Sequence, residues 1–208
     1  MMFLCLSLPG IKEEFFMEKT ELTQHQKIVR LVASGIMIAL ATVLSMVTII
    51  KMPLGGSLTP VSMLPICLIS IIYGVKWGLG TAFAYALVQL IIDFSSAVGW
   101  GLSVPALVAC FVFDYILAFT SLGMAGIFRN KKGWGICAGV ALAVILRYIC
   151  HIISGGTVFA VWMPDGWGNP WVYSMAYNGA FMFPEMILTI AAAYAVSKVP
   201  ALTKLTTA

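Results

Sequence analysis

The feature that most constrains this chain is the uncharged apolar run from Leu31 to Ile50. A helix of about 20 apolar residues is long enough to cross the roughly 30 Å hydrocarbon core of a bilayer. In lipid the backbone must satisfy its own hydrogen bonds, so such a run is helical. The whole chain is 61% hydrophobic and 10% charged, whereas a soluble domain carries about 25% charged residues. We therefore predict an integral membrane protein within a lipid bilayer.

The predicted fold class is an all-α membrane protein with six transmembrane helices. Lys51-Met52-Pro53 and the Gly55-Gly56 pair end the first span, because proline and paired glycines interrupt helices. The predicted spans cover residues 28–50, 62–73, 77–94, 104–128, 134–155 and 173–197. We expect three parts: a cytoplasmic N-terminal segment (1–27), a transmembrane substrate-binding domain (28–200) and a cytoplasmic tail (201–208). Met17 is an alternative start.

Basic residues mark alternate connections between the predicted spans. They are Lys27 and Arg30, Lys76, Arg129, Lys131 and Lys132, and Lys198 and Lys204. The opposite side has Lys51 alone. Basic loops stay in the cytoplasm, so both termini are predicted to be cytoplasmic. This topological role also explains the net charge of +4 without a nucleic-acid partner.

Ionisable residues inside the predicted spans are candidates for a functional site, because burying them in lipid is costly. They include Asp114, Arg147, His151 and Glu185. Arg147 and His151 are four residues apart and share one helix face. A structural ion pair between Asp114 and Arg147, or a packing role for His151, would explain these residues as well as a binding site does.

Aromatic residues crowd the predicted outer loop between Gly155 and Tyr177. They are Phe159, Trp162, Trp167, Trp171 and Tyr173. An interfacial aromatic belt is one explanation, and a site for a flat or cationic ligand is the other. Asp114, His151 and Asn178 belong near the same outer level. Together these groups favour a small organic cation with hydrogen-bonding ring nitrogens.

Catalytic signatures are missing from the sequence. It contains no GxSxG serine, no HExxH and no Walker A motif. We therefore predict that the chain is not an enzyme, holds no metal or cofactor, and does not hydrolyse ATP itself.

Two blocks, Arg147–Gly155 and Asn169–Gly179, carry a specific resemblance. They resemble the thiamine-specific S components of energy-coupling-factor vitamin transporters. So do Met52–Ser57, Met63-Leu64-Pro65, and Asp114-Tyr115 followed by Ser121–Gly126. The similarity extends in order over residues 28–200.

The resemblance implies a six-helix subunit of the bacterial cell membrane that binds thiamine with high affinity. Its implied partners are a transmembrane coupling protein and two ATPases, which use the ATP. At matching positions it implies vitamin contacts from Asp114, Tyr115, His151, Tyr173 and Asn178, with Gly155 inside the first block. Asp114 would neutralise the thiazolium, while His151, Tyr173 and Asn178 would hydrogen-bond the pyrimidine.

The sequence departs from some members of the family at two positions. Asp114 stands where some have Glu, and Phe159 where some have a stacking Trp. Trp162 and Trp100 are therefore further candidates for the ring that stacks on the vitamin.

Small residues Gly35 and Ala39 lie four apart on the first span. Such spacing serves close helix packing within a chain, but the resemblance implies that this face docks the coupling protein. Three rival functions remain: an S component for another heteroaromatic vitamin, a proton-coupled secondary thiamine carrier using Asp114 and Glu185, and an intramembrane enzyme using His151 and an acid.

Overall fold

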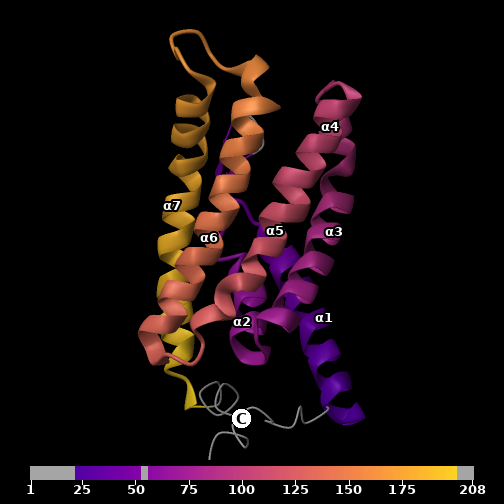
Figure 1. The fold of residues 1–208 in the computed structure, drawn as a ribbon, viewed down its shortest axis with the longest axis vertical. Coiled ribbons are helices and arrows are strands. Elements are labelled where there is room, and N and C mark those ends of the chain that lie inside the picture. Colours follow the sequence, from indigo (N-terminus) through magenta and orange to yellow (C-terminus); the bar gives the residue numbers. More distant parts are fainter. Residues whose placement is uncertain (1–21, 53–55, 201–208) are drawn as a thin grey trace, which may run out of the picture.

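A computed structural model describes residues 22–52 and 56–200, which form a bundle of helices (Figure 1). The continuous α-helices are the short α2 (Leu64–Tyr73) and the longer α1 (Gln24–Met46), α3 (Val75–Gly99), α6 (Lys132–Thr157) and α7 (Pro170–Ser197). A further rod between α3 and α6 is built from α4 (Val104–Cys110), the π-helix η1 (Phe111–Leu117), α5 (Ala118–Thr120) and the 3₁₀ helix η2 (Ser121–Phe128). The remaining elements are β1 (Ile50–Lys51), β2 (Ser57–Leu58) and η3 (Ala160–Trp162).

Five of the described helical elements are long and apolar enough to cross a membrane. They are α1, α3, the rod from Val104 to Phe128, α6 and α7. This confirms a multi-pass helical membrane protein. The remaining predicted span, the second (residues 62–73), corresponds to α2, which has only 10 residues. At 1.5 Å per residue it is about 15 Å long, about half of the hydrocarbon core.

The first predicted span has different ends in the structure. A capping box starts α1 early: the Thr23 hydroxyl accepts from the Gln26 amide at 3.2 Å, and the Gln26 side chain accepts from the Thr23 amide at 3.0 Å. The prediction of helix through Ile50 was wrong, because α1 ends at Met46 and Ile50 belongs to a strand. Residues 47–50 are all β-branched, and β-branched side chains favour extended backbone.

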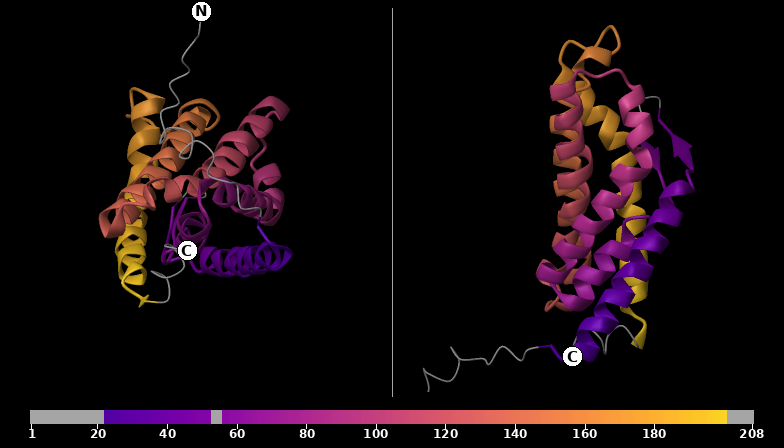
Figure 2. Two further views of the ribbon diagram at one scale, coloured as in Figure 1. Left: turned by 60° about the horizontal axis from the view of Figure 1, so that its bottom comes forward. Right: turned by 90° about the vertical axis from the view of Figure 1, so that its right-hand side faces the viewer.

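The two short strands form an antiparallel hairpin that the sequence did not indicate. Ile50 pairs with Leu58, and Lys51 with Ser57. The hairpin lies on the flank of the bundle (Figure 2), where β2 contacts α7. The chain between α1 and α2 is thereby held against the helices that carry the site.

The other predicted spans are closer to the structure. The rod has the predicted bounds, residues 104–128, whereas α3 runs five residues past Phe94. α7 starts at Pro170, three residues before the predicted start, because the Asn169 side chain caps it by accepting from the Trp171 amide at 2.8 Å. Proline at the first helical position fits this start.

The core is centred on α2, in which residues 65–72 are all buried. The Ser70 hydroxyl accepts from the Gly126 amide at 2.9 Å and donates to the Gly123 carbonyl. Neither glycine has room for a Cβ, so η2 packs directly on the backbones of α2 and α3. η2 thus packs against α2 and α3 toward the end of the bundle where α1 begins (Figure 1).

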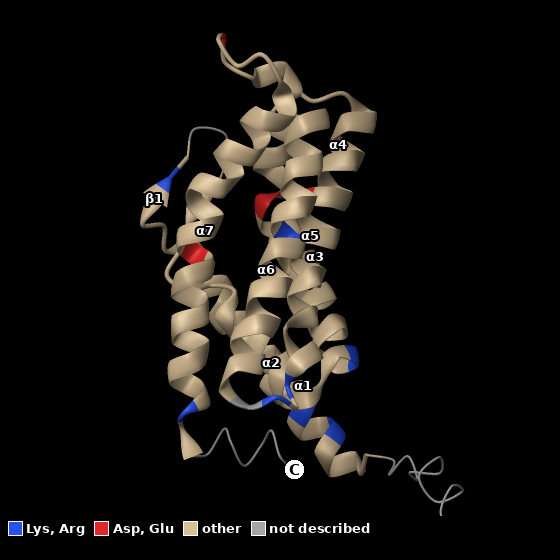
Figure 3. Cartoon of the chain, turned by 60° about the vertical axis from the view of Figure 1, so that its left-hand side comes forward, with Lys and Arg blue, Asp and Glu red and all other residues tan. Residues whose placement is uncertain are grey.

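Charged residues are distributed unevenly along the bundle. In Figure 3 most of the Lys and Arg segments gather at the end that holds the start of α1 and the end of α7. This is the arrangement that the positive-inside rule requires of a cytoplasmic end.

Candidate ligand-binding site

A cavity of about 490 Å³ lies among α1, α3, η1, α6 and α7, with residues of the hairpin along one side. This volume is within the usual range for small-molecule sites. Eight of the nine residues predicted to contact a ligand line it: Trp100, Asp114, Tyr115, His151, Gly155, Phe159, Tyr173 and Asn178. Trp162 is not among the lining residues.

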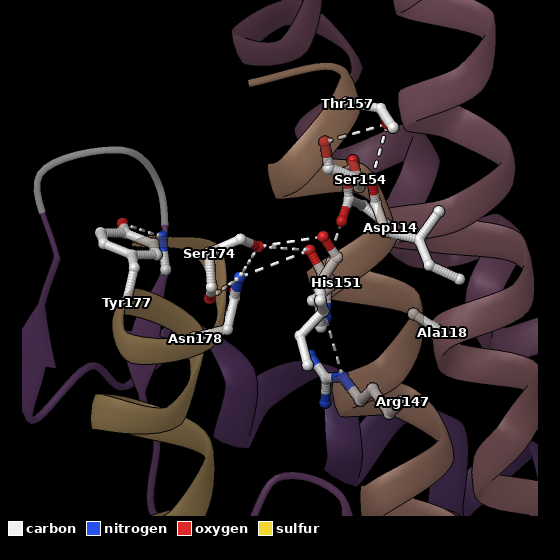
Figure 4. Close-up of polar contacts among 12 residues, drawn as sticks. Asp114, Ala118, Arg147, His151, Ser154, Thr157, Ser174, Tyr177 and Asn178 are labelled. Atoms are coloured by element: carbon white, nitrogen blue, oxygen red, sulfur yellow. Dashed lines mark hydrogen bonds and ion pairs between the residues drawn. The ribbon is translucent and has the colours of Figure 1, made fainter. Parts of the chain in front are cut away.

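Asp114 is at the centre of the site, on the π-helical turn η1 (Figure 4). Its Oδ1 accepts a hydrogen bond from His151 Nδ1 at 2.7 Å, and its Oδ2 accepts from the Ser154 hydroxyl. The Asp114 and His151 side chains are each 14% exposed. π-helical turns commonly occur at functional sites, and this one places the carboxylate against two residues of α6.

His151 connects Asp114 to Arg147. The Arg147 Nε–H donates to His151 Nε2 at 3.3 Å, so the imidazole carries its proton on Nδ1 and donates it to Asp114. The Arg147 guanidinium also lies 4.3 Å from the centre of the Phe119 ring. The structure therefore shows an imidazole between the two charges rather than the direct Asp114–Arg147 ion pair considered above. With both nitrogens engaged, the ring can offer a ligand its face.

Asn178 is fixed at the junction of α6 and α7. Its Nδ2 donates to the Ser174 carbonyl at 2.9 Å and to the His151 carbonyl at 3.4 Å. Its Oδ1 has no hydrogen bond within the described part of the chain. Gly155 permits this junction, since a Cβ there would collide with the Ser174 side chain. The role of Gly155 in the site is thus close helix approach.

Aromatic rings form the wall at the outer part of the cavity. Trp100 and Phe159 meet edge to face, with ring centres 5.4 Å apart and an interplanar angle of 78°. Trp162 packs behind Phe159, also at 5.4 Å. On α7, Tyr173 and Tyr177 line the cavity with ring centres 5.8 Å apart. Trp100 and Phe159 are therefore better placed than Trp162 to stack on a ligand.

The formal charge of the cavity wall is negative. Three carboxylates line it, those of Asp93, Asp114 and Glu185, against the basic side chains of Lys51 and Arg147. The carboxylates thus outnumber the Lys and Arg side chains by one. A wall of this composition suits a monocation that also carries aromatic rings.

Comparison with known proteins identifies the family. The model of the thiamine transporter protein family matches residues 31–204. This chain belongs to the thiamine transporter family. The thiamine transporter ThiT of Bacillus subtilis is 34% identical over 182 residues, which cover 80% of this chain and 89% of that protein. The ThiT of Lacticaseibacillus paracasei is 25% identical over 181 residues, covering 80% and 86% respectively.

A solved structure of ThiT from Listeria monocytogenes has the same fold. It superposes with a TM-score of 0.70 over 86% of this chain and 98% of that one, at 19% sequence identity. Membership of the thiamine transporter family confirms the resemblance found in the sequence. Because its members are named as transporters, it also confirms that the chain is not an enzyme.

Several lining residues in this family member were not predicted as site residues. Gln89, Asp93 and Ser96 lie on α3, and Thr59 and Ser62 lie between β2 and α2. Asp93 carried a usable signal, because it is an acid inside the predicted span of residues 77–94, but it was not chosen as a site residue. The two hydroxyl residues carried none, since nothing local indicates that they face Glu185.

Proposed function

We propose that this chain captures thiamine from outside the cell, as the substrate-binding S component of an energy-coupling-factor importer. The observation that carries the proposal is the cavity itself: in a member of the thiamine transporter family, it combines aromatic rings, polar groups and more carboxylates than Lys and Arg side chains. Thiamine has a flat aminopyrimidine, a flat thiazolium and one permanent positive charge. These properties match the wall of the cavity.

The polar residues suit the two rings in different ways. The Asn178 Oδ1 can accept from the exocyclic amine of the pyrimidine, since the Nδ2 of that amide is used by Ser174 and His151. The face of His151 can stack on a ring, held in orientation by Asp114. Tyr115 and Tyr173 bring phenol groups to the cavity, and Trp100 and Phe159 enclose it with their rings.

The partner proteins would dock on the outward face of α1. Gly35 is exposed, and a Cβ added there would meet no other atom within 4 Å. Ala39 is also exposed, and so are the larger side chains of Ile36 and Leu40 beside it, at 62% and 46%. Small residues on such a face let a second helix approach closely. We propose that the coupling protein binds this face and that its two ATPases supply the energy, with both ends of the chain in the cytoplasm.

Ligand binding by the isolated chain tests the proposal. The protein is purified in detergent from cells grown without thiamine, and thiamine is added while tryptophan fluorescence is followed. Because Trp100 lines the cavity, we expect quenching that saturates at one equivalent. Absence of binding would overturn the proposal. If the chain alone, reconstituted in vesicles, concentrates thiamine on a proton gradient, the secondary-carrier alternative replaces it.

A further inference from the structure

Two lysine side chains lie over aromatic rings at the end of the bundle where α6 begins and α7 ends. The Lys131 Nζ is 5.1 Å from the centre of the Trp134 ring and 5.9 Å from that of the Phe128 ring. The Lys198 Nζ is 4.6 Å from the centre of the Tyr194 ring. Both lysines are exposed. A ring attracts an ammonium group and orients it, but it does not neutralise the charge, so both groups can still bind an anion.

The two lysines belong to one site because α6 and α7 pack along each other. Gly133 directly precedes Trp134 in α6, and a Cβ added to this glycine would lie 3.3 Å from the Tyr194 ring. The Tyr194 ring therefore rests on the α6 backbone one residue away from Trp134. We call the four residues Lys131, Trp134, Tyr194 and Lys198 the basic aromatic cluster.

The carboxylates of the described residues lie elsewhere. Asp93, Asp114 and Glu185 line the cavity, and Asp165 lies between η3 and α7. Neither lysine of the cluster forms an ion pair with any of these four acids. In Figure 3 the acidic segments are away from the end of the bundle where the basic segments gather. Within residues 22–52 and 56–200 the cluster thus has two positive charges without a carboxylate partner, and an anionic group outside the bundle would complement them.

The surroundings of the cluster are those of side chains that face lipid. Trp134 and Tyr194 are both exposed, and such amphipathic rings gather at the level of lipid headgroups. Ile187 lies seven residues before Tyr194 and is 64% exposed. Seven residues are two turns, so both side chains lie on the same face of α7, about 10 Å apart along its axis. The site therefore combines charges for a headgroup with an apolar face for an acyl chain.

The cluster is on a different flank of the bundle from the proposed docking face. α1 packs against α2 and α3, and Figures 1 and 2 show α1 on the opposite side of the bundle from α7. A coupling protein bound at Gly35 and Ala39 would therefore leave this part of α6 and α7 to the lipid.

We propose that the basic aromatic cluster is a binding site for one anionic phospholipid. Lys131 and Lys198 bind the phosphate of the headgroup, and Trp134 and Tyr194 hold the two ammonium groups in place. One acyl chain lies along the face of α7 that carries Tyr194 and Ile187. This inference goes beyond the proposed function and does not depend on which ligand the cavity takes.

Native mass spectrometry of the purified chain tests the proposal. Phosphatidylglycerol or phosphatidylethanolamine with the same acyl chains is titrated into the detergent, since the first headgroup is anionic and the second is zwitterionic. We expect the wild-type chain to retain one phosphatidylglycerol in preference to phosphatidylethanolamine. The double variant Lys131→Gln/Lys198→Gln should bind phosphatidylglycerol about 30-fold more weakly, as for two lysines at an anionic lipid surface. Its binding of phosphatidylethanolamine should not change.

A matched control removes the same charge from the same end of the bundle. Lys27 and Lys76 are exposed residues of α1 and α3. The double variant Lys27→Gln/Lys76→Gln should bind phosphatidylglycerol like the wild-type chain. Equal weakening in both double variants overturns the proposal, because net charge rather than a site then attracts the lipid. Size-exclusion chromatography shows that each variant is folded before it is compared.

Three further results would also overturn the proposal. The first is a wild-type chain that retains both lipids equally. The second is binding of glycerophosphoglycerol, the headgroup without acyl chains, as tightly as the lipid, because the cluster is then a site for free phosphate esters. The third is a Lys131→Gln/Lys198→Gln variant that keeps its phosphatidylglycerol but no longer copurifies with the other subunits of the importer, since the cluster then contacts protein.

Discussion

A 2.7 Å hydrogen bond joins His151 Nδ1 to Asp114 Oδ1 and thereby links the π-helical turn η1 to α6. On its other side the imidazole accepts from Arg147 at 3.3 Å. The three side chains form one polar unit on the wall of the cavity (Figure 4). Because each nitrogen of the imidazole has a partner, the orientation of the ring depends on both neighbours.

Asp114→Asn should weaken thiamine binding strongly. Its side chain loses the charge that holds His151, and a hydrogen bond to a charged group contributes about 1.5–3 kcal/mol, so we expect a loss of roughly tenfold to a hundredfold. Calorimetry on folded protein measures the effect. If Asp114 acts through His151, the same change made in a His151→Ala background should cost much less. Wild-type affinity in folded Asp114→Asn would refute any role of this carboxylate in binding.

Gly155→Ala should destabilise the protein by overpacking the junction of α6 and α7. The added methyl group would collide with Ser174, and overpacking typically costs about 1–3 kcal/mol. Ser174→Gly removes the obstructing side chain, so the double variant should regain thermal stability relative to Gly155→Ala alone. Melting curves in detergent measure both effects. If Ser174→Gly restores nothing, the close approach at this position is not what requires glycine.

The basic end of the bundle should face the cytoplasm. Single cysteines at Asn130 and Asn169, in a background without the native cysteines, report on opposite ends, because Asn130 connects η2 to α6 and Asn169 caps α7. An impermeant thiol reagent applied to whole cells should label position 169 only. Labelling of position 130 alone would invert the molecule and place the aromatic end of the cavity inside the cell.

Hydropathy predicts much of this fold because every helix that crosses lipid must be apolar over about 20 residues. The uncharged run in α1 and the bounds of the rod from Val104 to Phe128 follow from it directly. The hairpin does not, since the uncharged residues 47–50 have the same hydropathy whether they are helical or extended. The preference of β-branched residues for strands favours extended backbone in that segment. A hydropathy average carries no information about this preference.

The site was predictable where one residue carries a strong local signal. Asp114 and His151 stand out as ionisable residues in apolar spans, and the structure brings them into contact. The arrangement around Glu185 was not predictable. The hydroxyls of Thr59 and Ser62 donate to its carboxylate, but they are 126 and 123 residues away from it in the sequence. The hydrogen-bond partners of Glu185 depend on such contacts, and the sequence shows only that the carboxylate exists.

The outward face of α1 should matter for transport but not for binding. Gly35 and Ala39 are exposed, and the cavity contacts α1 only near its end, at Ser45 and Met46. Ala39 is six residues before Ser45, about 9 Å along the helix axis at 1.5 Å per residue. A tryptophan on this face would hold a partner helix away while leaving the site intact. We therefore expect Gly35→Trp and Ala39→Trp to abolish uptake and to leave thiamine binding by the purified chain unchanged.

Radiolabelled uptake in cells that contain the complete importer, compared with calorimetry on the isolated variants, separates these two effects. Phe83→Trp is a control, because Phe83 is 45% exposed on α3 and its replacement presents the same indole ring on a different helix; this variant should transport normally. Ala41→Trp, at a fully buried position of α1, should instead lower stability and binding together. If Gly35→Trp behaves like Ala41→Trp, the small residues serve packing within this chain, and the partner docks elsewhere. If Gly35→Trp behaves like Phe83→Trp, this face touches only lipid.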